Sequence, residues 1–178
     1  MDTIDILCVG EVLVDFIGHQ EGVLINETRD YHRYLGGSPT NVAMNSTRLG
    51  LNTIMVATVG NDGFGSYITE RLSSVGVNTN HLNVLENKST SVIFVSRSEG
   101  TPDFIPYRSA DCCIYEEQIS SEILSNTKIF HTTCFALSKN TAKILIILLS
   151  SISLISAYFI NINLFVVLLV YFVLNIAY

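Results

Sequence analysis

The sequence GGSPTNVA at residues 36–43, followed by six residues and Gly50 and by nine more and Gly60, decides the fold of this chain. A glycine has no Cβ, so the glycine pair lets the backbone turn tightly or come close to a ligand. Ser38 suits a helix N-cap and Pro39 the first helical position, and Gly50 ends the apolar spacing that follows. The stretch predicts a glycine turn that leads into a helix.

This spacing resembles the first signature of the ribokinase/PfkB family of carbohydrate kinases, and VGNDGFG at residues 59–65 is similar to that family's usual continuation. The resemblance covers residues 5–143. The Ser38-Pro39 pair is closest to the branch of fructokinases, 2-keto-3-deoxygluconate kinases and 5-dehydro-2-deoxygluconokinases. The resemblance implies a doubly wound, Rossmann-like α/β fold with a mainly parallel sheet, here an incomplete one, and a small β-rich lid. The implied activity is ATP-dependent phosphorylation of a sugar hydroxyl, for a substrate of the fructose or keto-deoxy sugar acid class.

The apolar pattern independently predicts an α/β fold, because strand-like and helix-like segments alternate along the chain. Buried strands are expected at residues 5–10, 53–59 and 128–134, and further strands at 81–85, 91–96 and 103–107. Helices are expected at residues 64–75, with Asp62 as N-cap and Gly76 as the stop, and at 116–124. Segments near residues 16–35 and 90–108 are expected to form the lid, through which members of the family often dimerise.

Six residues are implied as sugar ligands by the resemblance: Asp15, Gly36, Gly37, Asn41, Tyr107 and Arg108. Asp15 follows the first strand toward the carboxyl edge of the sheet, where ligands bind in open α/β folds. An Asn41 amide can donate and accept hydrogen bonds, and an arginine fork suits a carboxylate or several hydroxyls.

Each of these residues also has a purely structural interpretation. The glycines can form a tight turn, Asn41 can cap a helix, Asp15 can be a solvated loop carboxylate, and Arg108 can stack on a neighbouring ring.

The second signature of the family, built around Gly-Ala-Gly-Asp, is absent from the 178 residues. In the family it supplies the catalytic base and the backbone amides that hold the transferring phosphate. We therefore assign no catalytic residue and no nucleotide ligand, and expect ATP and Mg²⁺ to serve the complete family enzyme but not to bind productively here. The leading hypothesis is a truncated, inactive kinase product that keeps the sugar-binding half, so its status as an enzyme is left open.

Residues 144–178 contain no charge, glycine or proline, and 28 of these 35 residues are apolar. This segment is long enough to cross a bilayer, which needs roughly 20 apolar helical residues. Translation of an AT-rich gene out of frame would give the same composition, and we favour that interpretation. The alternative is a non-catalytic, membrane-anchored sugar-binding or interaction module.

Charge and cysteine content exclude several classes of protein. A net charge of −6 with scattered Lys and Arg gives no reason to expect nucleic acid as a partner. The four cysteines form no C-x-x-C pair and the four histidines share no metal-ligand spacing, so no metal site is expected. A dinucleotide-dependent oxidoreductase is disfavoured, because no G-x-G-x-x-G follows the first strand. These features predict a cytoplasmic protein with reduced thiols. The resemblance implies a small-molecule sugar as its partner.

Overall fold

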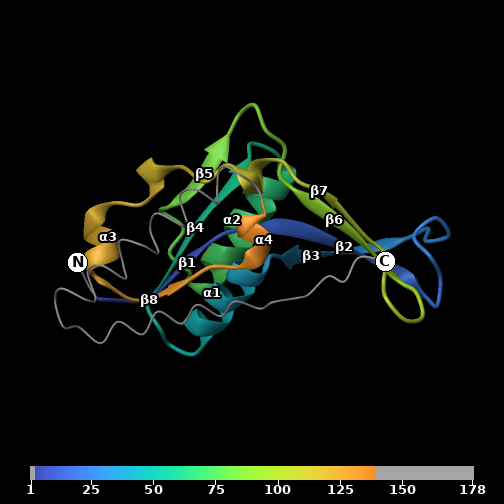
Figure 1. The fold of residues 1–178 in the computed structure, drawn as a ribbon, viewed down its shortest axis with the longest axis horizontal. Coiled ribbons are helices and arrows are strands. Elements are labelled where there is room, and N and C mark those ends of the chain that lie inside the picture. The colour runs from blue at the N-terminus through green and yellow to red at the C-terminus, as the bar shows by residue number, and fades with distance from the viewer. Residues whose placement is uncertain (1–2, 139–178) are drawn as a thin grey trace.

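The computed structural model describes residues 3–138, and within them the chain forms two four-stranded sheets joined end to end (Figure 1). The expected domain boundary at residue 143 and both interpretations of residues 144–178 lie outside the described residues. No helix within residues 3–138 has the length and apolar character needed to cross a membrane. The observed architecture confirms the predicted α/β fold with a mainly parallel sheet and a small β-rich lid.

The first sheet is parallel throughout and has the order β5-β4-β1-β8. Its strands are β1 (Ile4–Val9), β4 (Thr53–Gly60), β5 (Leu82–Leu85) and β8 (Thr127–His131). β1 pairs with β4 on one side and β8 on the other, which explains why its residues are almost all apolar and buried. The strand expected at residues 128–134 was too long, because the Thr133 hydroxyl accepts from Ala136 N and starts helix α4 (Cys134–Leu137).

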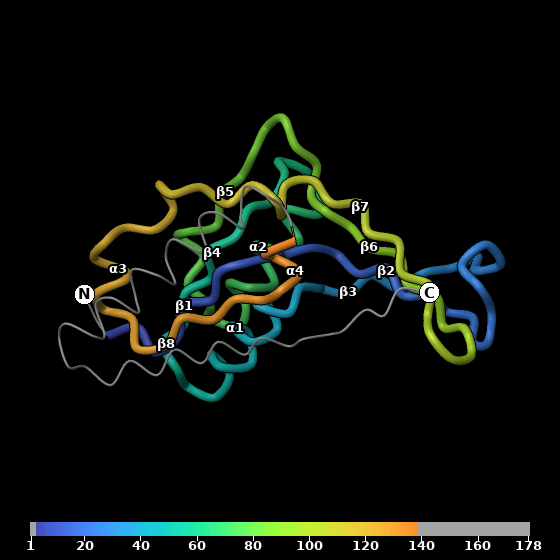
Figure 2. The backbone as a smooth tube through the Cα atoms, in the orientation of Figure 1, coloured from blue at the N-terminus to red at the C-terminus, as the bar shows by residue number. Residues whose placement is uncertain are grey.

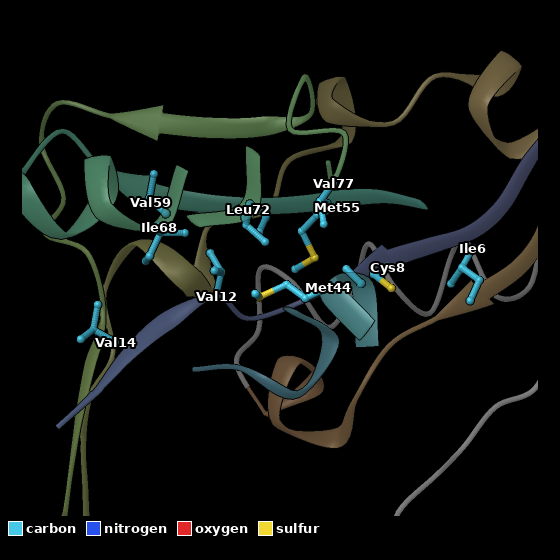
Figure 3. Close-up of a cluster of buried hydrophobic side chains, with 12 residues drawn as sticks. Ile6, Cys8, Val12, Val14, Met44, Met55, Val59, Ile68, Leu72 and Val77 are labelled. Atoms are coloured by element: carbon cyan, nitrogen blue, oxygen red, sulfur yellow. The ribbon is translucent and has the colours of Figure 1, made fainter. Parts of the chain in front are cut away.

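Helices α1 (Ser38–Arg48) and α2 (Gly63–Val75) cover one face of this sheet. Met44 of α1 and Ile68 and Leu72 of α2 share an apolar cluster with Cys8 of β1 and Met55 of β4 (Figure 3). Both ends of α2 are as predicted, since Asp62 accepts from Phe64 N and Gly65 N and Gly76 is left-handed with φ 89°.

The other face of the sheet is covered by η1 (Ala110–Cys112), η2 (Glu116–Gln118), α3 (Ser121–Ser125) and α4. The single helix expected at residues 116–124 was wrong. The Gln118 amide donates instead to Ala57 O at 2.8 Å and His81 O at 3.1 Å, and Ser120 begins a new helix by accepting from Ile123 N. Long-range hydrogen bonds therefore override the helical pattern of this segment.

The second sheet forms the lid and has the order β3-β2-β6-β7. Its strands are β2 (Leu13–Glu21), β3 (Tyr31–Gly36), β6 (Val92–Arg97) and β7 (Phe104–Tyr107). β2 pairs with β6 in parallel, and the outer two pairings are antiparallel. The chain enters this sheet directly from β1, so the lid begins at the carboxyl end of the central strand (Figure 1).

Candidate functional site

A cavity of about 280 Å³ lies where β1 ends and the lid begins. Its lining residues come from the β1–β2 junction, the start of α1, the β6–β7 hairpin and α4: Glu11, Leu13, Asp15, Gly37, Ser38, Asn41, Ile93, Phe104 and Phe135. Figure 2 shows α4 and the start of β2 together near the middle of the molecule, between the two sheets. The cavity therefore occupies the edge of the parallel sheet at which α/β folds bind ligands.

Asp15 lies on β2, half-buried, and pairs across the strands with Tyr34 and Ile93. Burial raises the pKa of its carboxyl group above the usual 3.8. Gly36 is buried beside it, and a Cβ at Gly36 would collide with the Asp15 carboxylate. Gly36 therefore leaves the space that this carboxylate occupies, although it does not itself line the cavity.

Gly37 joins the lid to α1 and is the N-cap residue of that helix, so the expected Ser38 N-cap was wrong. Its backbone has φ 104°, a conformation that glycine tolerates and L side chains rarely adopt. A Cβ at this position would collide with the backbone oxygen of Glu11. Asn41 lies one helical turn further on, where its N–H donates to Gly37 O at 2.9 Å. The structure thus brings Asp15, Gly37 and Asn41 to one cavity, and their contact with a sugar stays a prediction.

Glu11 is a cavity residue that the sequence analysis missed, and its side chain is almost completely buried. Its Oε1 accepts from Ser38 N at 3.1 Å, and its Oε2 accepts from the Thr133 hydroxyl at 2.7 Å. Burial raises the pKa of the Glu11 carboxyl, and these hydrogen bonds partly oppose that shift. Glu11 ties the start of α1 to the start of α4. Its position just after a buried strand, like that of Asp15, was the signal that could have identified it.

Two phenylalanine rings form an apolar wall that sequence reasoning also missed. The ring centroids of Phe104 and Phe135 lie 6.2 Å apart in an edge-to-face arrangement, which is a favourable geometry for aromatic pairs. Phe104 comes from β7 and Phe135 from α4, so their contact joins the lid to the main sheet at the cavity. No local pattern in the sequence indicates this contact.

Tyr107 and Arg108 do not line the cavity, so their contact with a sugar stays a prediction. Tyr107 pairs with Val92, the neighbour of the cavity residue Ile93. Because neighbouring residues of a strand point to opposite faces, Tyr107 lies on the face of the lid opposite to Ile93. Its side chain is exposed and meets Phe94 edge to face. Arg108 instead forms an ion pair with Asp111 and lies over the Phe135 ring, 4.0 Å from its centroid.

Comparison with known proteins agrees with this fold. The model of the pfkB family of carbohydrate kinases matches residues 3–154, eleven residues beyond the expected boundary at 143. The ATP-dependent 6-phosphofructokinase of Thermoanaerobacterium thermosaccharolyticum is 37% identical over 139 residues, which is 78% of this chain and 42% of that protein. Probable fructokinase-3 of Arabidopsis thaliana is 34% identical over 129 residues, 71% of this chain and 37% of the relative.

Solved structures give the same result. The fructokinase of Halothermothrix orenii superposes with a TM-score of 0.81 at 32% identity, over 86% of this chain and 55% of that one. An uncharacterized sugar kinase from Pyrococcus horikoshii in complex with ATP gives a TM-score of 0.77 at 30% identity, over 86% of this chain and 50% of that one.

Fold and cavity together define a ribokinase-like α/β protein with a lid beside a cavity at the edge of the parallel sheet. The family match covers most of the sequence, and the chain belongs to the pfkB family of carbohydrate kinases. It spans about half or less of the length of the relatives and structures it matches.

Proposed function

We propose that this chain is the sugar-binding half of an ATP-dependent kinase that acts on a sugar of the fructose or keto-deoxy sugar acid class. The convergence of Asp15, Gly37 and Asn41 on one cavity carries the proposal. These three residues come from a lid strand, a glycine turn and the start of a helix. A cavity at which a few polar groups from different elements converge is typical of small-molecule sites.

The chemistry of the wall suits a sugar. The Asp15 carboxylate can accept hydrogen bonds from hydroxyls, and the Asn41 amide can both donate and accept. The Phe104 and Phe135 rings offer an apolar surface to the carbon face of the ligand. A monosaccharide presents this combination of hydroxyls and C–H groups.

The means of phosphoryl transfer are not found in these residues. Transfer depends on positioning and on electrostatic stabilisation of the phosphoryl group, which the family obtains from the Gly-Ala-Gly-Asp signature that this sequence lacks. Among residues 3–138, no group of three or more His, Cys, Asp or Glu side chains could hold a metal ion. We propose that ATP and Mg²⁺ act only in a complete family enzyme, and that the lid is its dimer surface.

The 178-residue protein is expected to show no ATP-dependent phosphorylation of fructose, 2-keto-3-deoxygluconate or ribose. Binding a sugar without the residues that hold the transferring phosphate gives no rate enhancement. A coupled ADP-release assay against a vector-only preparation measures this. Turnover above that control, abolished when magnesium is removed, would contradict the proposal that this chain is inactive.

Asp15→Asn is expected to weaken D-fructose binding by roughly tenfold to a hundredfold, because hydrogen bonds to a charged group contribute about 1.5–3 kcal/mol. Isothermal titration calorimetry measures the affinity.

Since burial raises the pKa of Asp15, ionising it opposes folding, and its contribution to stability is lost as pH rises through that pKa. The variant is therefore expected to unfold at a higher temperature than the wild type at pH 7.

Asp30→Asn is the matched control for this experiment. Asp30 is exposed beside the same sheet and accepts from Gln20 Nε2 at 2.9 Å, outside the cavity. This change is expected to leave fructose affinity unchanged. If Asp15→Asn and Asp30→Asn bind fructose equally well, Asp15 is not a sugar ligand.

A further inference from the structure

Arg108 and Asp111 form an ion pair that is buried behind the candidate site, with their side chains only 5% and 0% exposed. Arg108 Nε donates to Asp111 Oδ2 at 2.8 Å, and Nη2 lies 2.6 Å from the same oxygen. The other carboxylate oxygen, Oδ1, accepts from the Ser91 hydroxyl at 2.5 Å. Both oxygens of Asp111 are therefore engaged.

The remaining edge of the guanidinium faces α4. Arg108 Nη1 donates to Phe135 O at 2.9 Å and to the Ser138 hydroxyl at 2.6 Å, while the guanidinium lies over the Phe135 ring. Phe135 lines the cavity and Arg108 does not. The arginine thus supports the cavity wall from behind, and its charge is already matched by Asp111.

The cavity itself has a one-sided distribution of charge. Glu11 and Asp15 line it, and none of the lining residues that the structure describes is Lys, Arg or His. A ligand carboxylate or phosphate placed there would lose its hydration beside two carboxyl groups, and Arg108, whose charge acts on Glu11 from behind the wall, is already paired with Asp111. Burial of an unpaired charge is costly, and like charges in one site add to that cost.

We propose that Asp111 sets the charge selectivity of this site: by holding Arg108 away from the ligand, it makes the cavity accept an uncharged sugar and reject sugar acids and phosphosugars. This inference rests on the proposed function and narrows its substrate class. Asp111 acts through Arg108, so it is a positioning residue and not a ligand.

The wild-type protein tests the inference with one uncharged and two anionic six-carbon ligands. Calorimetric titrations with D-fructose, 2-keto-3-deoxygluconate and fructose 6-phosphate are expected to show fructose bound at least about tenfold more tightly than either anion. Equal or tighter binding of an anion would overturn the inference and leave the proposed function standing. If none of the three binds, the proposed function fails and the inference falls with it.

Asp111→Asn tests the positioning role. It keeps the shape of the side chain and removes the negative charge that neutralises Arg108, so affinity for 2-keto-3-deoxygluconate is expected to rise about tenfold while that for fructose changes less than about threefold. The matched control is the double change Arg108→Gln with Asp111→Asn, which removes the cation and is expected to show no gain for the acid.

If Asp111 had only a structural role, Asp111→Asn would lower the affinities for fructose and for 2-keto-3-deoxygluconate together. An unchanged ratio of the two affinities in a folded Asp111→Asn protein would therefore contradict the proposal. Circular dichroism establishes whether the variant is folded, and if it is not, the wild-type ligand series decides.

Discussion

Asp111→Ala is expected to lower the free energy of unfolding by about 3–5 kcal/mol, because it leaves the Arg108 guanidinium buried without its counter-charge. The change also removes the acceptor of the Ser91 hydroxyl, which Ser109 N and Asp111 N in turn use as their own acceptor. A buried polar network that loses one member leaves several groups unsatisfied. Urea denaturation followed by circular dichroism measures the loss.

Two further variants compare this buried ion pair with a solvent-exposed ion pair and with an uncharged replacement. Glu21→Ala breaks the ion pair between Glu21 and Arg97, whose side chains are 74% and 48% exposed, and is expected to cost at most about 1 kcal/mol. Arg108→Met with Asp111→Leu removes both buried charges and is expected to recover most of the loss. If Asp111→Ala costs no more than Glu21→Ala, the pair does not support the fold as described.

Gly37→Ala is expected to lower the free energy of unfolding by about 3 kcal/mol and to abolish detectable fructose binding. The alanine backbone must adopt φ 104°, and its Cβ collides with the backbone oxygen of Glu11. Because that oxygen belongs to the backbone and not to a flexible side chain, it cannot move away easily. Moving Glu11 or the start of α1 to relieve the collision displaces both walls of the cavity. Urea denaturation and fructose titration measure the two effects.

Gly50→Ala is the matched control, because Gly50 also has a positive φ, 87°, but a Cβ there meets nothing within 4 Å. It is expected to cost only the conformational strain, about 1–2 kcal/mol, and to leave fructose binding intact. Equal losses from the two changes would mean that the contact with Glu11 contributes nothing.

Local signals in the sequence predicted those elements whose ends are determined by neighbouring residues. Helix α2 is an example, since Asp62 caps its start through Phe64 N and Gly65 N and Gly76 ends it. The start of α1 was misplaced by one residue because a distant side chain intervenes: Ser38 N donates to Glu11, 27 positions earlier. Residues 116–124 failed as a helix for a similar reason, because the Gln118 amide donates to Ala57 O of strand β4 and to His81 O, the residue just before β5.

The residues of the candidate site also divide into those that local sequence signals indicate and those that only tertiary packing brings together. Asp15, Gly37 and Asn41 lie in or near a recognisable motif, so the sequence could suggest them. Phe104 and Phe135 come together only through tertiary packing, and no local pattern marks either of them. Arg108 and Asp111 stand three residues apart, a spacing at which an ion pair could have been anticipated.

The hydrogen bond between Glu11 and Thr133 joins residues 122 positions apart, and β1 gains its second neighbour only from residues 127–131. On a ribosome that adds roughly 5–20 residues per second, about 5–20 seconds separate the synthesis of Asn41 from that of β8. During that interval the central strand lacks one partner and the buried carboxyl of Glu11 lacks one donor. The nascent chain therefore carries its motif residues well before it can assemble the cavity, and a sugar can assist only the last step of folding.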